Sequence, residues 1–238
     1  MASADLLDLA EWAARTARFS TTGSDLTLAK AAVNDAYLST CADGSPFDFL
    51  QQEGQWTTTA GSDVYSYSSI ATAMSVSGAS IAEIETLTND DDGYPLESMS
   101  WSALEAWSHS TQDDPDGMPT HWSKWASRIR LYPTPDATYT LGCFVRLVPA
   151  EMTADADTPL IPLAWRRRLL VPYAAAILLR TEGGLETAAE ANRLMEGYER
   201  DFIAFRTAYA TAKRPTFRLA TPGWEARNPV DRFGFGDW

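Results

Sequence analysis

Cysteine and histidine are scarce in this chain of 238 residues, which contains two of each. Cys41 and Cys143 lie far apart in the sequence and form no Cys-x-x-Cys pair, which argues against a disulfide framework and against a thiolate metal site. We therefore expect two buried free thiols. His109 and His121 lack the i, i+4 partner of a helical metal site, and both are predicted to lie in loops or at the surface.

Long apolar runs are also missing. No stretch approaches the ~20 residues that a helix needs to span a bilayer. The N-terminal residues Asp5, Asp8 and Glu11 are acidic, whereas a secretory signal would be basic there. We expect no membrane contact and synthesis in the cytoplasm.

Positive charge is in short supply, because 19 Lys and Arg residues face 32 Asp and Glu residues, leaving a formal charge of −13. This balance argues against a nucleic-acid binder that gains affinity by neutralising phosphates. It is compatible with a duct through which DNA slides, since the walls of such a duct should not hold phosphates. Any contact with DNA is therefore expected to be non-specific.

Sequence patterns of catalytic sites are absent: there is no Gly-x-Ser-x-Gly, no phosphate-binding glycine loop and no His-Glu-x-x-His. Two stretches, Asn89 to Gly93 and Asp113 to Gly117, resemble calcium loops. Position twelve of such a loop needs a carboxylate but would fall on Met99 and Ser123. Both stretches are predicted to be turns, with a weakly held surface ion as the alternative. We predict no cofactor, no metal site and no enzymatic activity.

What the sequence does contain is a large apolar fraction, 45%, and clear helical periodicity near its N-terminus. One amphipathic helix is predicted from Asp5 to Arg18, and a second from an N-cap at Ser24 to about Thr40. Because a short link joins them, the two helices should pack antiparallel. Their apolar stripes are Leu6, Leu9, Ala10, Ala13, Ala14 and Ala17 in the first helix and Leu28, Ala29, Ala32, Val33, Ala36 and Tyr37 in the second.

Two further helices are predicted in the C-terminal third. The helix from about Leu163 to Thr181 is apolar around most of its girth, so it should be the buried centre of the helical part, with a bend at Pro172. The helix from Glu186 to about Ala212 carries an apolar seam that is interpreted as bundle core, with a seam between subunits as the alternative. That seam is Ala188, Ala191, Met195, Tyr198, Phe202, Phe205 and Tyr209.

Between these helical regions the composition changes to Thr, Ser, Tyr and Trp, which is typical of β-structure. The longest signal is a predicted hairpin from Arg128 to Arg146, whose first arm alternates polar and apolar residues and whose turn is Pro133 to Asp136. The other predictions are two strands between Trp56 and Tyr67, a strand from Ile81 to Leu87, a short strand from Leu96 to Met99, helical turns from Ser102 to Trp107 and a polar loop from Asp113 to Pro119.

The predicted fold class is therefore α+β: a helical bundle of about four helices with an inserted antiparallel β domain and an extended C-terminal arm. The predicted divisions are residues 1–43 for the N-terminal helix hairpin, 44–150 for the β domain, 151–213 for the helices that complete the bundle and 214–238 for the arm.

Two features are candidate contact sites. Burial of one aromatic side chain contributes about 1.5 to 3 kcal/mol, so the arm should dock either on its own domain or on a partner. A run of three arginines lies at a predicted helix start, where the helix dipole disfavours positive charge. This placement suggests that the run contacts an acidic partner surface, the alternative being a solvated or salt-bridged face. The residues concerned are Phe217, Trp224, Phe233, Phe235 and Trp238 in the arm, and Arg166, Arg167 and Arg168 in the run.

The order of several sequence pieces resembles the head–tail adaptor proteins of tailed bacteriophages, also called connector or head-completion proteins. The pieces cover most of residues 25–180. They are Val33-Asn-Asp-Ala-Tyr37, a Thr-Ala-Gly run around Thr58 that leads to Tyr65, Ile129-Arg-Leu-Tyr-Pro-Thr-Pro-Asp136 and Asp155-Ala-Asp-Thr-Pro-Leu-Ile-Pro162.

This resemblance implies a structural virion protein at the head–tail interface, assembled in the host cytoplasm. Copies would form a ring, commonly of twelve, beneath the portal protein, with the helical part facing the portal and the β domain facing outward. The C-terminal segment would reach into the portal, a tail or further connector protein would bind next, and DNA would pass through the channel without specific binding.

Two other classes of function compete with this interpretation. A virion-associated cell-wall hydrolase would use paired carboxylates such as Glu83 and Glu85, but alternation along one strand would place both on its solvated face. A glycan-binding module would need exposed tryptophans, for which core packing is the alternative. The tryptophans concerned are Trp101, Trp107, Trp122 and Trp125.

Overall fold

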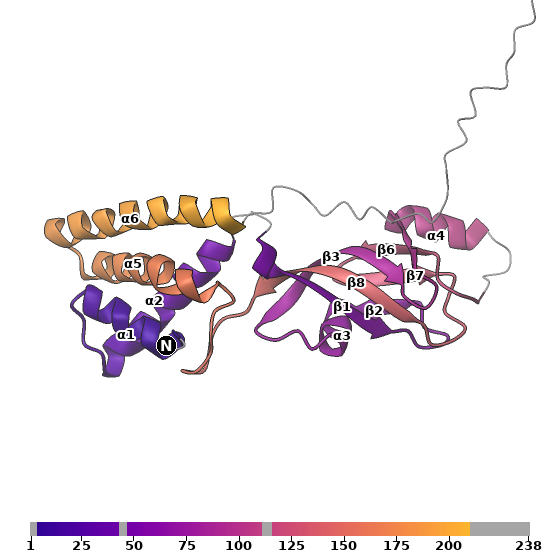
Figure 1. The fold of residues 1–238 in the computed structure, drawn as a ribbon, viewed down its shortest axis with the longest axis horizontal. Helices are drawn as coiled ribbons and strands as arrows, with labels where there is room; N and C mark the ends of the chain where they lie inside the picture. Colours follow the sequence, from indigo (N-terminus) through magenta and orange to yellow (C-terminus); the bar gives the residue numbers. More distant parts are fainter. Residues whose placement is uncertain (1–3, 43–46, 111–115, 210–238) are drawn as a thin grey trace, which may run out of the picture.

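A computed structural model describes residues 4–42, 47–110 and 116–209 (Figure 1). The described chain is elongated, with four helices at one end and two β-sheets with two shorter helices at the other. The α+β class predicted from the sequence is confirmed. The elements are α1 (Leu6–Thr16), α2 (Gly23–Cys41), β1 (Gln51–Thr57), β2 (Val64–Ser66), α3 (Tyr67–Ala73), β3 (Ala79–Asn89), β4 (Tyr94–Pro95), β5 (Glu97–Met99), α4 (Trp101–Ser110), β6 (His121–Trp125), β7 (Arg128–Tyr132), β8 (Thr140–Pro149), α5 (Leu163–Glu182) and α6 (Leu185–Tyr209), with a short 3-10 turn at Asp48–Leu50.

The helical part is organised around α5, which packs against α1, α2 and α6. The predicted stripe of α1 is fully buried, and Asp5 caps this helix by accepting a hydrogen bond from the amide of Asp8 at 2.9 Å. Helix α5 contains Pro172 and ends before Gly183, whose φ of 73° is one that glycine adopts without strain. The predicted central position of this helix is confirmed.

Two details of α2 differ from the prediction. The helix begins at Gly23, and its N-cap is Thr22, so Ser24 lies inside the first turn and does not cap it. Leu28, which the sequence predicts to belong to the apolar stripe, is 41% exposed. The rest of the predicted stripe is buried, so the helical period still identifies the face that packs.

The β part consists of two four-stranded sheets that enclose a second core. One sheet has the order β1-β8-β3-β4 and is antiparallel throughout. The other has the order β2-β7-β6-β5 and is mixed, because β5 pairs parallel with β6. The prediction of a purely antiparallel β domain is therefore wrong for this second sheet. Inward-facing residues such as Trp122, Leu131 and Val145 are almost fully buried between the sheets.

The hairpin predicted from Arg128 to Arg146 is also wrong. Both arms are strands, but β7 pairs with β2 and β6, whereas β8 pairs with β1 and β3. The segment between Tyr132 and Thr140 carries the chain from one sheet to the other. Ile129 and Leu131 on β7 and Val145 on β8 bury their side chains in the shared core, and this burial decides the arrangement.

Strand β3 contains two irregularities that a strict alternation does not predict. Its buried residues Ile81, Ile84 and Leu87 recur every three positions, although a regular strand turns every second side chain to the same face. The register with β8 shifts once between Ile81 and Glu83 and again between Ile84 and Thr86. Each shift adds one residue, so all three apolar side chains reach the core.

Three elements differ from the prediction in type or extent. Helix α3 was missed, although Ser66 caps it by accepting from the amide of Ser69 at 3.1 Å. Strand β6 is not predicted from the sequence either. His121 lies in this strand and not in a loop. His109 lies within α4, which is longer than the predicted helical turns. These segments are short and carry no clear hydrophobic period, so the sequence pattern alone does not identify them.

Candidate functional site

Two of the sequence pieces that carry the adaptor resemblance meet in the helical part, on the segment that leads from β8 to α5. The side chain of Asn34 on α2 donates to the carbonyl oxygen of Met152 at 2.9 Å and accepts from its amide at 3.0 Å. One turn further on, the hydroxyl of Tyr37 accepts from the amide of Leu160 at 3.0 Å. Burial raises the pKa of Tyr37 to about 12. Helix α2 therefore holds the start and the end of this connecting segment.

The same segment also closes over the start of α1. The amide of Leu6 donates to the carbonyl of Asp157 at 2.9 Å, and that of Leu7 donates to the carbonyl of Asp155 at 3.2 Å. The Asp155 carboxylate pairs with Lys30 of α2. Hydrogen bonds from the amides of Ala154 and then Thr153 lower the pKa of Asp157. We call this set of contacts, from Met152 to Leu160, the linker clamp.

The other two sequence pieces meet in the β part. Thr58 donates through its amide to the carbonyl of Tyr139 at 2.9 Å, and its hydroxyl donates to Ala137 while accepting from the amide of Tyr139. The amide of Gly61 donates to the carbonyl of Pro135 at 2.7 Å. The Tyr65 hydroxyl accepts from the amide of Thr59 and so closes the turn before β2. This second set is the turn clamp.

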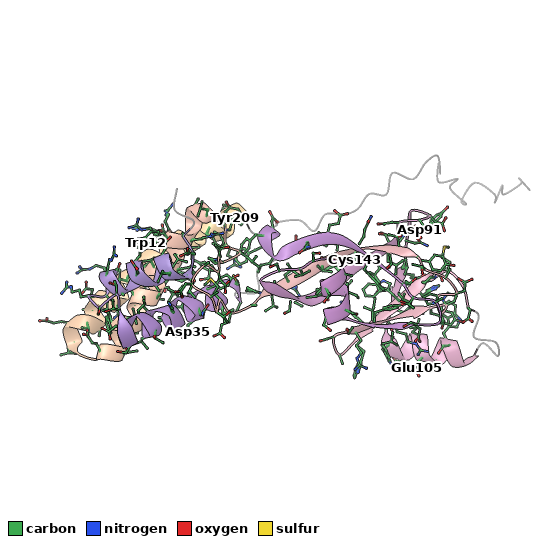
Figure 2. The ribbon with its side chains drawn as sticks, turned by 90° about the horizontal axis from the view of Figure 1, so that it is seen from below. Trp12, Asp35, Asp91, Glu105, Cys143 and Tyr209 are labelled. Atoms are coloured by element: carbon green, nitrogen blue, oxygen red, sulfur yellow. The ribbon has the colours of Figure 1, made fainter. Side chains whose placement is uncertain are left out.

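An ion-pair network lies beside the turn clamp. Arg130 on β7 donates to the carboxylates of Asp63 and Glu105 at 2.8 Å each, and its side chain is 18% exposed. The network joins β7 to the segment before β2 and to α4 (Glu105, Figure 2). All four pieces of the resemblance therefore hold distant chain segments together, and their residues are occupied in structural contacts.

The predicted arginine run lies within the first two turns of α5, and each guanidinium has a partner within the chain. Arg166 donates to the carbonyl of Ile161 at 2.8 Å, and burial lowers its pKa. Arg167 lies over the ring of Trp12, 4.7 Å from its centroid; Trp12 is labelled in Figure 2. Arg168 lies over Trp165 and pairs with Asp201 at 2.8 Å. The run is a cationic surface whose orientation is fixed by aromatic rings.

An aromatic cluster marks the point where α6 ends. Phe205 is fully buried and lies 5.2 Å from the ring of Phe47. Tyr209, the last residue of α6, contacts Phe205 and also Phe49, which is two residues before β1. Figure 2 shows Tyr209 at the end of the helical part that faces the β part. The five predicted arm contacts, Phe217, Trp224, Phe233, Phe235 and Trp238, lie outside the described residues.

The two thiols are buried and free, as predicted. Burial raises the pKa of Cys41 and of Cys143 to about 12 each. The Cys143 sulfur lies 3.2 Å from the sulfur of Met74 on α3. Because the reactive form of cysteine is the thiolate, neither thiol is suited to nucleophilic chemistry at neutral pH.

The carboxylates that would serve a hydrolase are partly exposed and lie in an irregular stretch of β3. Glu83 forms ion pairs with Lys124 and with Arg146, the latter at 2.6 Å. Glu85 is the extra residue of the second irregularity in β3, so the strict alternation that put both carboxylates on one face does not hold. This arrangement is a structural ion pair beside a bulge and lacks the two facing carboxylates of a glycosidase.

The acidic stretch from Asn89 to Gly93 is a turn, as predicted. The amide of Gly93 donates to the carbonyl of Asn89 at 2.7 Å, and the Asn89 side chain accepts from the amide of Asp91 at 3.0 Å. The second stretch, Asp113 to Gly117, lies largely outside the described residues. Within the described ranges, no group of three or more His, Cys, Asp or Glu side chains converges in a way that could hold a metal ion.

The tryptophans considered for glycan binding divide between the core and the surface. Trp122 is 1% exposed and belongs to the β core. Trp107 lies against His121 and Tyr132, with ring centroids 4.6 and 5.2 Å away. Trp125 is 65% exposed and lines an open hollow of about 570 Å³ together with Trp101. Core packing is therefore confirmed for Trp122 and does not apply to Trp125.

The chain was also compared with known protein families. A family model described as SU10 adaptor protein matches residues 2–224 of the chain. No curated protein sequence matches the chain. Among the described residues, no helix combines the length and the apolar character that crossing a membrane requires.

Proposed function

We propose, from the premise that the chain belongs to the SU10 adaptor protein family, that it is a structural virion protein forming a head–tail adaptor ring beneath the portal of a tailed phage. The family match spans nearly the whole chain and agrees with the resemblance to phage head–tail adaptors seen in the sequence. The proposed protein acts by assembly: its subunits dock on the portal, associate side by side and extend the DNA channel towards the tail. A tail or further connector protein binds next.

The observation that carries this proposal is the family match together with the two clamps. The four pieces of the resemblance form the linker clamp in the helical part and the turn clamp in the β part, and each clamp joins segments that are distant in the sequence. In the proposed ring, a bundle of about four helices, built from residues 1–43 and 151–213, faces the portal. The inserted β domain, residues 44–150, faces outward. A braced subunit suits a ring whose copies, commonly twelve, must repeat one geometry.

The proposal is tested by mixing the full-length chain with its cognate portal protein and measuring the masses of the complexes by native mass spectrometry. The expected result is a complex that contains one portal ring and many copies of this chain, with electron microscopy placing the copies below the portal. A chain that stays monomeric and unbound at all ratios would overturn the proposal.

The arginine run is proposed as a contact to an acidic surface of the portal or of a neighbouring subunit. The rings of Trp12 and Trp165 hold two of the guanidinium groups in place, so little side-chain freedom is lost on binding. Arg167→Glu should therefore weaken portal binding. Arg128→Glu, which changes an exposed arginine of β7 in the β part, should leave it unchanged. Equal binding by both variants would exclude the run from the interface.

The formal charge of −13 supports a channel that lets DNA pass without holding it. The full-length chain should not retard a DNA duplex in a gel-shift assay at physiological salt. Retardation that weakens steeply as salt rises would instead indicate phosphate contacts and would contradict a channel of this kind.

A further inference from the structure

The outer face of the sheet β1-β8-β3-β4 carries a hollow with a volume of about 660 Å³. Its lining includes Glu53 and Gln55 from β1, Thr86 from β3, Asp90 at the end of β3, and Gly142 and Phe144 from β8. We call this the sheet hollow. Neighbouring side chains on β8, such as Leu141 and Val145, face the core instead.

The floor of the sheet hollow depends on Gly142. Gln55 and Thr88 lie opposite this glycine on the two neighbouring strands. The carboxylate of Asp90 accepts from Gln55 at 2.7 Å and from Thr88 at 2.9 Å, and so lies across the strand. A Cβ atom at position 142 would lie 2.6 Å from oxygen atoms of Thr88 and Asp90. These hydrogen bonds therefore fix the side chains that form the floor of the sheet hollow.

The chemistry of the sheet hollow is acidic at its rim and apolar at its side. Glu53, Asp90 and Thr86 are exposed, and the half-buried ring of Phe144 supplies apolar surface between β1 and β3. No lysine or arginine is among the described residues that line it. Its volume lies within the range of about 300 to 1,000 Å³ that is usual for ligand pockets. It suits a segment that combines aromatic rings with positive charge.

Such a segment exists in the chain itself, in residues 210–238. This segment has five basic residues against three acidic ones, whereas residues 47–149 have four basic against fourteen acidic. It also contains five large aromatic side chains, which gain free energy when they leave water. Charge and apolar character in the two regions are therefore complementary.

The starting point of the segment brings it close to the sheet hollow. Tyr209 contacts Phe49, and β1, which supplies one side of the hollow, begins two residues after Phe49. β1 is an edge strand of its sheet (Figure 1). For a random coil of 29 residues the expected end-to-end distance is about 30 Å, and the seven residues of β1 cover about 23 Å. The number of residues in the segment is therefore sufficient for the distance to the hollow.

We infer that residues 210–238 dock in the sheet hollow of their own chain, with aromatic side chains against Phe144 and basic side chains near Glu53 and Asp90. This inference concerns the free subunit and does not rest on the portal proposal. In a subunit with this contact, the aromatic residues of the arm are covered before any partner is bound.

The test uses disulfide formation in the full-length chain. Thr86→Cys places a thiol in the sheet hollow, and Ala226→Cys places one in the arm. The matched control combines Ala226→Cys with Asp35→Cys, an exposed position on α2 (Figure 2). The native thiols are buried with pKa values of about 12, so they should not compete.

We expect the Thr86 pair to form an intramolecular disulfide several-fold faster than the control pair, measured by non-reducing gels and mass spectrometry. Glu53→Lys should slow this reaction about two- to five-fold, the effect of one exposed ion pair. Glu199→Lys on α6 makes the same charge change outside the hollow and should have no effect. Equal rates for the two cysteine pairs, or disulfides that form only between chains, would overturn the inference.

Discussion

At the scale of single residues, a buried polar side chain on α2 determines how the segment that leads from β8 to α5 is held. Asn34 is 8% exposed, and both polar atoms of its side chain bind the backbone of Met152. This arrangement satisfies a buried amide and a buried carbonyl that lie outside any helix or sheet ladder. The position therefore requires a side chain with one donor and one acceptor in a planar amide.

Asn34→Ala should lower the free energy of unfolding by about 2 to 3 kcal/mol, because it leaves the amide and carbonyl of Met152 buried without partners. Urea denaturation followed by circular dichroism measures this loss. Asp35→Ala, at the exposed neighbouring position, should change the value by less than about 0.5 kcal/mol. Similar losses in both variants would show that the clamp contributes little.

The raised pKa values of the two buried thiols indicate how the stability of the chain changes at high pH. Burial raises the pKa values of Cys41 and Cys143 from 9.0 to about 12, so the folded chain keeps both protons where the unfolded chain loses them. Their contribution to stability is complete below pH 9 and is lost between pH 9 and pH 12. The urea midpoint should fall as pH rises through this window.

The matched variant for this pH effect is Cys41→Ala. It removes one ionising thiol, so the midpoint should fall less steeply with pH than it does in the unchanged chain, even if the variant is less stable throughout. Identical slopes would mean that Cys41 ionises equally in both states.

At the scale of elements, α6 is the least enclosed of the long helices. Its main packing partner among the helices is α5, and its buried residues are Ala191, Tyr198 and Phe205, roughly two turns apart. The residues before β1 add aromatic contacts at its C-terminal end. A helix held along one seam depends strongly on the side chains of that seam.

Phe205→Ala should cost about 3 to 5 kcal/mol of stability, because it removes a fully buried ring that touches Phe47, Trp165 and Tyr209. Ile203→Ala changes an apolar residue on the same helix that is 66% exposed and should cost less than about 0.5 kcal/mol. Thermal unfolding of the two variants makes the comparison. If the Ile203 variant loses as much, the exposed face of α6 is also packed.

At the scale of the whole molecule, the chain has two separate hydrophobic cores, one in the helical part and one in the β part. Figure 1 shows these two parts side by side. The helical core includes Phe47 and Leu50, so the first crossing between the two parts is itself packed. The second crossing is the linker clamp. The two parts are therefore joined at two places, while each has its own core.

Separate cores predict separate responses to mutation. Phe205→Ala should lower the melting transition of the helical part and leave that of the β part within about a degree or two, and Ile129→Ala, in the β core, should do the reverse. Differential scanning calorimetry with hydrogen exchange assigns each transition to its part. A single transition that shifts equally in both variants would show that the cores unfold as one unit.

The sequence by itself determined the features that depend on neighbours along the chain. The stripe of α1 follows from apolar residues three and four positions apart, and α5 is central because it is apolar around most of its girth. The alternation of Ile129 and Leu131 identified β7 as a strand with one buried face. The family also followed from the sequence, because the order of its pieces is a property of the chain alone.

The tertiary structure decided which distant segments meet. Asn34 and Met152 are 118 positions apart, and Arg130 and Asp63 are 67 positions apart, so no local period indicates either contact. The same reason explains the assignment of β7 and β8 to different sheets: each strand pairs with partners that local propensity does not encode, and burial in the common core selects them. The spacing of Ile81, Ile84 and Leu87 likewise acquires its meaning only from the register with β8, which shifts twice to bring all three into the core.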